Sequence, residues 1–168
     1  MNDAALVNMH YSKKEVIRRN WRKWFHPVYG TMVFRNMLML PYREFSSFKY
    51  SHISSPFLKS TFEKVWSEEE EVLDRVCRTR FRSAGDVNQY VMKYWQYMEG
   101  KYEPQSPKIG KFLTISIHDE QIHDTLRNQK CKILCINDTE NISDFEARKR
   151  NMRESFEYIL PEKSTFEL

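Results

Sequence analysis

Apolar residues recur at the spacing of an α-helix along most of this chain. The clearest pattern runs from Asp86 to Gly100 and places six apolar residues on one stripe: Val87, Tyr90, Val91, Tyr94, Trp95 and Met98. This stripe predicts a helix that starts at Asp86, is closed by Gly100 and has one face buried in a core. Similar patterns predict further helices over residues 12–25, 55–66, 67–76, 119–127 and 143–159, three of which begin with a capping box, and residues 32–40 form a second apolar segment.

Two short segments have the pattern of strands. Residues 112–117 alternate between apolar and polar side chains, which predicts a strand. Residues Ile133 to Ile136 form a continuous apolar run with β-branched residues at both ends, closed by Asn137-Asp138, which predicts a buried strand over about 132–137. Ligands of open α/β sheets collect at the carboxyl ends of the strands, so Asp138 is placed where a carboxylate holds a metal or orients a reacting group. The alternative is that Asn137-Asp138 only form a turn.

Composition agrees with one packed unit spanning residues 1–168. The chain is 40% hydrophobic and 14% aromatic, which excludes a disordered or repetitive protein. It has only 4 Gly, so no glycine-rich phosphate loop can be written. The three cysteines include no CxxC pair and suggest neither a disulfide framework nor a zinc site. Together these patterns predict a helix-rich α/β fold with few strands, around 112–117 and 132–137, and about six helices.

Positive charge is concentrated at the start of the chain. Residues 1–50 carry nine Lys or Arg against three acids, a net charge of +6, whereas residues 51–168 have a net charge of −2. This indicates an anionic partner. The basic and aromatic segment 12–40 is either a membrane-surface segment or a solvated basic helix held to a core by its tryptophans. No apolar run is long enough to span a membrane and no signal peptide is recognised, so we expect a cytoplasmic protein, peripheral at the inner face of the membrane.

Three separated polar features suit phosphate chemistry. His52 precedes the Ser55-Pro56 pair and is either a general base or phosphate ligand, or a structural hydrogen-bonding residue. Arg80 and Arg82 precede the helix predicted at Asp86 and form either a phosphate clamp or a solvated turn. With Asp138 they would supply a proton-transfer group, positive charge and a ligand for a divalent cation. Spacing alone does not show that they meet.

The order of these features resembles the C-terminal half of the Stealth family. Its members are bacterial capsular or exopolysaccharide phosphotransferases, related to the animal N-acetylglucosamine-1-phosphotransferase. The segments that carry the resemblance are Lys23-Trp24-Phe25-His26-Pro27-Val28-Tyr29-Gly30, Ser51-His52-Ile53, Phe57-Leu58-Lys59-Ser60-Thr61-Phe62, Arg80-Phe81-Arg82-Ser83, Asp86-Val87-Asn88-Gln89, Cys135-Ile136-Asn137-Asp138-Thr139 and Pro161-Glu162-Lys163-Ser164-Thr165-Phe166-Glu167.

The resemblance implies the C-terminal part of a Rossmann-like catalytic domain that transfers a sugar 1-phosphate from a nucleotide-sugar donor to a hydroxyl of a glycan acceptor. It implies catalytic roles for His52, Arg82 and Asp138, as base or transient phosphate acceptor, pyrophosphate clamp, and orienting or Mg²⁺-binding residue. Arg80 and Asn137 would bind substrate. No nucleic-acid partner is expected.

This sequence departs from the family pattern in one respect. Family members carry a Thr-Trp-Val-Asp-Gly segment and an Asn-Asp-Asp segment, and neither occurs in these 168 residues. We therefore expect catalysis to need a separate N-terminal half. Two alternatives remain open, a basic binding module without catalysis and an inactive gene remnant.

Overall fold

The structure, a computed structural model, describes residues 3–46, 48–49, 52–81, 83–138 and 142–166. The described residues form eight α-helices, one short 3-10 helix (Pro27–Tyr29) and two strands, which confirms the expected helix-rich α/β class. None of these helices is long and apolar enough to cross a membrane. The chain divides into two compact units. Unit 1 comprises residues 1–50 and 55–106, and unit 2 comprises residues 51–54 and 107–168.

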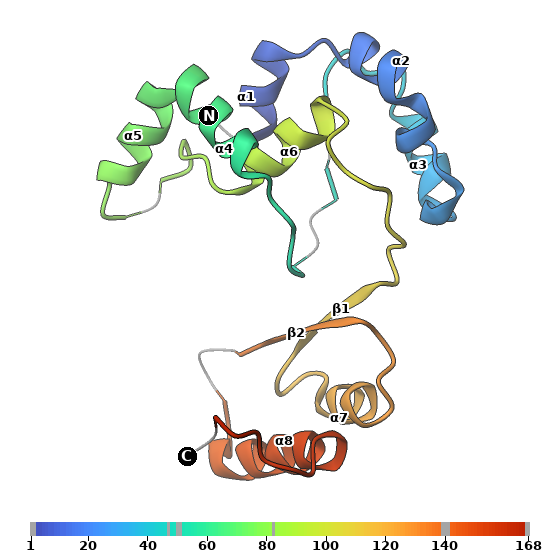
Figure 1. The fold of residues 1–168 in the computed structure, drawn as a ribbon, viewed down its shortest axis with the longest axis vertical. Helices are drawn as coiled ribbons and strands as arrows, with labels where there is room; N and C mark the ends of the chain where they lie inside the picture. The colour runs from blue at the N-terminus through green and yellow to red at the C-terminus, as the bar shows by residue number, and fades with distance from the viewer. Residues whose placement is uncertain (1–2, 47, 50–51, 82, 139–141, 167–168) are drawn as a thin grey trace. The chain divides into compact units, whose positions relative to one another are not determined.

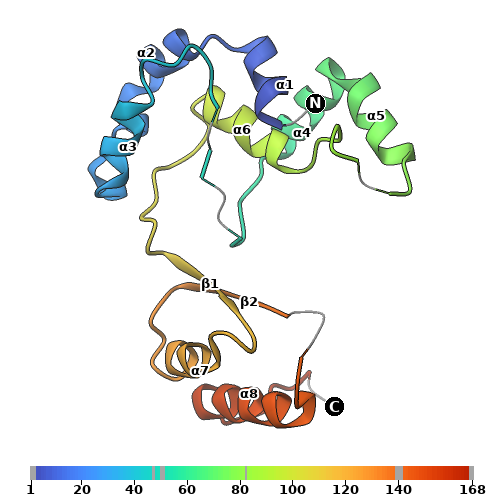
Figure 2. The same ribbon diagram turned by 180° about the vertical axis from the view of Figure 1, so that it is seen from behind.

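Unit 1 is helical and is built around one central helix, α6 (Tyr90–Met98). Val91 and Trp95 of α6 are fully buried, and they pack in one core with Leu6 of α1 and Val65 of α4. The other helices are α1 (Asp3–His10), α2 (Lys13–Trp24), α3 (Met32–Leu38), α4 (Lys59–Glu68) and α5 (Glu70–Arg78). Within this unit, α2 and α3 lie side by side at one end and α5 lies at the other (Figures 1 and 2).

The helix starts in unit 1 differ from the expected ones. The carboxylate of Asp86 accepts hydrogen bonds from the backbone N–H of Ser83 at 2.7 Å and from its hydroxyl at 2.9 Å, so Asp86 closes a turn and α6 begins only at Tyr90. Likewise, α4 begins at Lys59 and not at Ser55-Pro56. The sequence pattern did not indicate α1, which is held to the core by a bond from the Asn88 N–H to the Asp3 carboxylate at 2.8 Å.

Unit 2 contains a single β-α-β arrangement followed by a helix. Strands β1 (Gly110–Thr114) and β2 (Ile133–Asn137) are parallel, and α7 (Asp119–Arg127) connects them. Helix α8 (Phe145–Ile159) packs on α7, so the sheet, α7 and α8 form successive layers within this unit (Figure 1). Asp144, and not Ser143, caps α8.

Strand β2 lies where the sequence predicts it, but β1 does not. Strand β1 was expected over 112–117 and occupies Gly110–Thr114. Although Ile115 and Ile117 continue the apolar alternation, Ser116 adopts φ 75°, which is incompatible with a strand. The Ser116 N–H donates to the Asp119 carboxylate at 2.8 Å, so a turn replaces the end of the expected strand.

Candidate functional site

The two faces of the β1–β2 sheet have different environments. Paired residues of neighbouring strands project on the same face, and the register pairs Leu113 with Ile136 and Thr114 with Asn137. Leu113 and Ile136 pack with Ile122 and Leu126 of α7, so α7 covers their face. The opposite face, which we call the open face, carries Gly110, Phe112, Thr114, Ile133, Cys135 and Asn137.

His52 lies on this open face. Its imidazole is exposed and sits against the Phe112 ring, with ring centroids 4.8 Å apart. The next residue, Ile53, lies over Gly110: a Cβ atom added there would stand 3.0 Å from both Ile53 Cδ1 and Cγ2. A side chain at position 110 would require Ile53 to shift by a few tenths of an ångström, so glycine allows this close approach. Phe112 and Gly110 therefore hold the segment containing His52 against the sheet.

Asn137 and Asp138 lie at the carboxyl end of the same sheet. The Asn137 carbonyl accepts a hydrogen bond from the Ile115 N–H at 2.9 Å, and its side-chain amide donates to the Asp138 carbonyl at 2.7 Å. Both side chains are exposed. Asn137 projects from the open face, two residue steps or roughly 7 Å along the strand direction from the level of Phe112. His52 and Asn137 thus lie on the same face of the sheet.

A further group of polar residues lies at this edge, which the expected strand over 112–117 did not indicate. Because β1 ends at Thr114, the loop that follows also emerges at the carboxyl end of the sheet. His118 Nδ1 accepts a hydrogen bond from the Thr114 N–H at 3.1 Å. Asp119 forms an ion pair with Arg148 of α8. The sequence signal is Ser116-Ile117-His118-Asp119 after the apolar run, but the expected strand includes Ser116 and Ile117 and the expected helix begins at Asp119.

The arginines were expected to form either a phosphate clamp or a solvated turn ahead of a helix. Arg80 is exposed in unit 1, with its guanidinium 5.4 Å from the centroid of the neighbouring Phe81 ring, and Arg82 lies outside the described residues. The Ser83–Asp86 turn lies between Arg80 and the start of α6 at Tyr90, where a helix start at Asp86 had been expected. His52, Asn137 and Asp138 belong to unit 2, whereas Arg80 belongs to unit 1.

A metal site complete within the described residues is not formed. Over that part of the chain, no three His, Cys, Asp or Glu side chains converge as metal ligands would. Asp138 is exposed and belongs to no such group among the described residues. Magnesium is commonly bound by one or two carboxylates together with substrate phosphates and water, so Asp138 fits as one ligand of a shared site.

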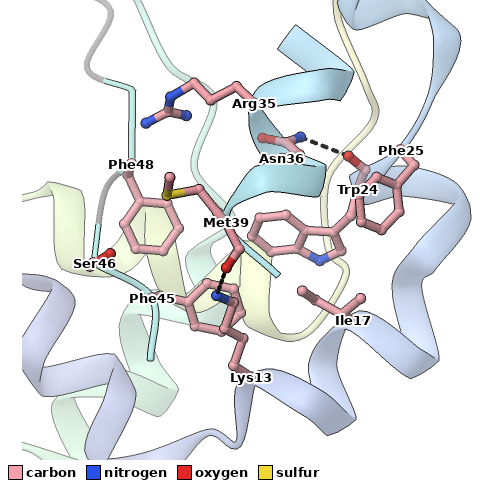
Figure 3. A pocket seen from close by; sticks show the side chains of 10 residues that line it. All are labelled: Lys13, Ile17, Trp24, Phe25, Arg35, Asn36, Met39, Phe45, Ser46 and Phe48. Atoms are coloured by element: carbon pink, nitrogen blue, oxygen red, sulfur yellow. Dashed lines mark hydrogen bonds between the residues drawn. The ribbon is translucent and has the colours of Figure 1, made fainter. Parts of the chain in front are cut away.

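A pocket in unit 1 lies between α2, α3 and the segment around Phe45 (Figure 3). The empty volume of the pocket is about 450 Å³, which includes space that is open to solvent. The Lys13 ammonium is buried at one side, where it donates to the carbonyls of Met39 at 2.5 Å and Tyr42 at 2.9 Å. Burial lowers the pKa of Lys13. Lys13 is thus an internal link between α2 and the end of α3, and not part of an exposed basic surface.

Comparison with known proteins relates the chain to polysaccharide-synthesising enzymes. Residues 124–168 match the family model described as Stealth protein CR4, conserved region 4. The whole chain is similar to the capsular polysaccharide phosphotransferase WcwK of Streptococcus pneumoniae, with 34% identity over 167 residues, which is 99% of this chain and 50% of that protein.

Two further relatives match over the same extent. The receptor polysaccharide phosphotransferase WefC of Streptococcus gordonii is 33% identical over 100% of this chain and 50% of its own length. The exopolysaccharide phosphotransferase cps2G of Lactiplantibacillus plantarum is 30% identical over 99% of this chain and 49% of its own length. The chain thus spans about half the length of these relatives. No solved structure matches it.

Proposed function

We propose that this chain, which corresponds to the C-terminal half of a Stealth-family polysaccharide phosphotransferase, supplies the acceptor-activating part of a site for sugar 1-phosphate transfer. The observation that supports this most strongly is that His52, against Phe112 in the middle of β1, shares the open face of a parallel sheet with Asn137, which lies at the carboxyl end of β2. Ligands of open α/β sheets bind at this edge.

The proposed reaction joins a sugar 1-phosphate to a hydroxyl of a capsular or exopolysaccharide glycan. The acceptor oxygen forms a bond to the β-phosphorus of a nucleoside diphosphate-sugar. The bond between that phosphorus and the bridging pyrophosphate oxygen breaks, and a nucleoside monophosphate leaves. The proton of the acceptor hydroxyl passes to a base, and the product is a glycan phosphodiester.

His52 is our candidate for that base, because an imidazole is the side chain best suited to take a proton near neutral pH. Asn137 would hold the acceptor hydroxyl or a phosphate oxygen through its amide. In this proposal Arg80 and Arg82 bind the pyrophosphate as bidentate donors. The alternative role of His52 as transient phosphate acceptor predicts an acid-labile phosphohistidine, which the general-base role does not.

Magnesium would take one ligand from this chain, the Asp138 carboxylate, and would neutralise charge on the pyrophosphate. Its remaining ligands would come from substrate phosphates, water and the other half of the enzyme. The partners in this proposal are therefore a nucleotide-sugar donor, a glycan acceptor and an N-terminal half. We also place the reaction at the inner face of the membrane, in keeping with the basic N-terminal third of the chain.

The test is a two-part assay. DNA upstream of the Met1 codon is translated in all three forward frames, and any segment similar to the other half of WcwK is co-expressed with this chain. If no such segment is found upstream, this chain is co-expressed with the other half of WcwK itself. Each half and the pair are incubated with Mg²⁺, a panel of nucleotide-sugars and capsular glycan, and nucleoside monophosphate release is measured together with the ³¹P signal of a phosphodiester.

Release and phosphodiester formation by the pair, and by neither half alone, is the expected result. The proposal is overturned if the pair is inactive with every donor while full-length WcwK turns over in parallel.

A further inference from the structure

Helix α3 is unusual for a surface helix because its exposed side is apolar. Its inner side carries Arg35 and Asn36, which line the pocket, and the Asn36 amide donates to the Trp24 carbonyl at 2.8 Å (Figure 3). Its outer side carries Phe34, Met37 and Leu38, which are 68%, 51% and 72% exposed. A solvated helix normally places its charged and polar residues outside. The outward apolar side of α3 therefore indicates a partner.

The exposed apolar residues form one surface. Phe34, Met37 and Leu38 are spaced i, i+3 and i+4, so they are neighbours on the helix. Leu40, 44% exposed, follows just beyond the end of α3. We call these four residues the α3 apolar face. Contiguous exposed apolar surface is uncommon on soluble monomers and marks sites of interaction.

The helix beside this face is strongly basic. Lys14, Arg18, Arg19 and Arg22 of α2 are exposed, whereas Lys13 and Lys23 are engaged with backbone carbonyls of unit 1. Glu15, paired with Arg19 at 4.0 Å, is the single acidic residue of α2. Trp21 is 56% exposed, and the Arg22 guanidinium lies 5.5 Å from its ring centroid.

We propose that α2 and α3 form a membrane-docking surface, in which the α3 apolar face enters the interfacial region of an anionic bilayer and the α2 cations bind lipid phosphates. Peripheral proteins combine shallow apolar insertion with basic residues in this way. This surface differs from a membrane-surface helix made by α2 alone. Its apolar residues come from α3, and α2 supplies the cations.

The charge of α2 favours an anionic bilayer over other kinds of partner for this surface. A second copy docked face to face would bring the exposed α2 cations toward those of its partner, and like charges oppose such an interface. A nucleic acid would be attracted by the cations but would leave the aliphatic α3 face uncovered. An anionic lipid surface satisfies both features. This inference does not depend on the catalytic proposal.

The test is flotation of the chain with vesicles of phosphatidylcholine alone or mixed with phosphatidylglycerol. We expect binding to the anionic vesicles that weakens with salt. The double variant Phe34→Ser/Leu38→Ser should bind at least about tenfold more weakly, because two large apolar side chains no longer enter the bilayer. A matched control, Phe145→Ser/Leu160→Ser, changes two exposed apolar residues of unit 2 and should bind as the parent chain does.

A second variant tests the basic part. Arg18→Gln/Arg19→Gln/Arg22→Gln should weaken binding and flatten its salt dependence, and circular dichroism should show unchanged helix content in every variant. Equal binding of Phe34→Ser/Leu38→Ser and the parent chain overturns the proposal. So does the absence of vesicle binding together with a concentration-dependent dimer that this variant abolishes, or RNA binding that only the arginine variant abolishes.

Discussion

The imidazole of His52 lies against the phenyl ring of Phe112, with the ring centroids 4.8 Å apart. This contact joins a residue from the loop before α4 to the middle of β1. It places the candidate base on the open face of the sheet that carries Asn137 at its carboxyl end. The geometry of this side of the proposed site therefore depends on how closely the 52–53 segment approaches β1.

Gly110→Ala should disturb the position of His52. The new Cβ would lie 3.0 Å from two side-chain carbons of Ile53 and 3.1 Å from the Ile133 carbonyl oxygen, so Ile53 has to move away from the sheet. We expect a changed chemical shift of the His52 ring protons and a loss of about 1–3 kcal/mol in unfolding free energy. Adding Ile53→Ala should recover part of the shift, and identical spectra for Gly110→Ala and the parent chain would contradict this arrangement.

His52→Ala should lower the turnover of the two-part enzyme by about 10²-fold or more, because general bases contribute on that scale. The measurement is nucleoside monophosphate release at saturating donor. His26→Ala, which removes another exposed histidine, serves as the control and should retain most of the activity. Near-parental turnover of His52→Ala would remove this residue from the mechanism.

Asp138→Asn should weaken the binding of Mg²⁺ to the two-part enzyme. Loss of one carboxylate ligand is expected to raise the Mg²⁺ concentration for half-maximal activity about tenfold or more. The measurement is a Mg²⁺ titration of nucleoside monophosphate release. Glu157→Gln neutralises an exposed carboxylate of α8 and should leave the titration unchanged. An unchanged Mg²⁺ requirement in Asp138→Asn would exclude Asp138 as a ligand.

Local patterns predicted the elements better than the site. The apolar run closed by Asn137-Asp138 placed β2 correctly, since a run of that length and composition fits a buried strand. The end of β1 was wrong because apolar alternation continues past Thr114, and only the left-handed conformation of Ser116 ends the strand. The turn closed by Asp86 likewise looked like a helix cap, because an aspartate accepts backbone hydrogen bonds equally well in both.

The contact between His52 and Phe112 has no local signal. It depends on the absence of a side chain at Gly110, and a glycine before a strand is usually assigned to a turn. The position of His118 at the sheet edge was not predicted, because the strand was expected to continue to residue 117. Sequence reasoning therefore identified chemically suitable residues but not which of them share a face.

Glu99 should make the stability of unit 1 sensitive to acid. Burial alone would raise the pKa of this carboxyl, but hydrogen bonds from Lys101 and Lys64 outweigh burial and hold its pKa below the usual value. A carboxyl with a depressed pKa stabilises the folded state above its unfolded pKa, and this stabilisation is lost as pH falls through the folded pKa. Unfolding free energy should therefore decline below about pH 4.5.

The check is chemical unfolding of the chain between pH 7 and pH 3. Glu99→Gln should be less stable at pH 7 by about 1–3 kcal/mol, since Lys64 and Lys101 lose a charged acceptor, and its stability should decline less with acid. Glu103→Gln, which changes an exposed carboxylate nearby, provides the comparison. Parallel pH profiles for Glu99→Gln and the parent chain would show that Glu99 does not carry this dependence.

Lys13→Met should loosen α3 from α2. The Lys13 ammonium donates to the Met39 and Tyr42 carbonyls, at and just beyond the end of α3, and methionine fills similar volume without donating. Unpaired buried carbonyls cost about 1–3 kcal/mol, so urea unfolding of unit 1 should shift to lower concentrations. Lys14→Met removes an exposed neighbouring cation and should change stability little.

The pH dependence gives this prediction a second readout. Because burial lowers the pKa of Lys13, this group binds more protons in the unfolded chain than in the folded chain just below pH 10.5, and it contributes a rise of stability with pH there. Lys13→Met should lose that rise, whereas Lys14→Met should keep it. If Lys13→Met matched Lys14→Met in stability, pH profile and vesicle binding, Lys13 would not anchor α3. The α3 apolar face would then be held in place by the hydrogen bond from Asn36 to the Trp24 carbonyl and by the aromatic packing around Trp24 and Phe45.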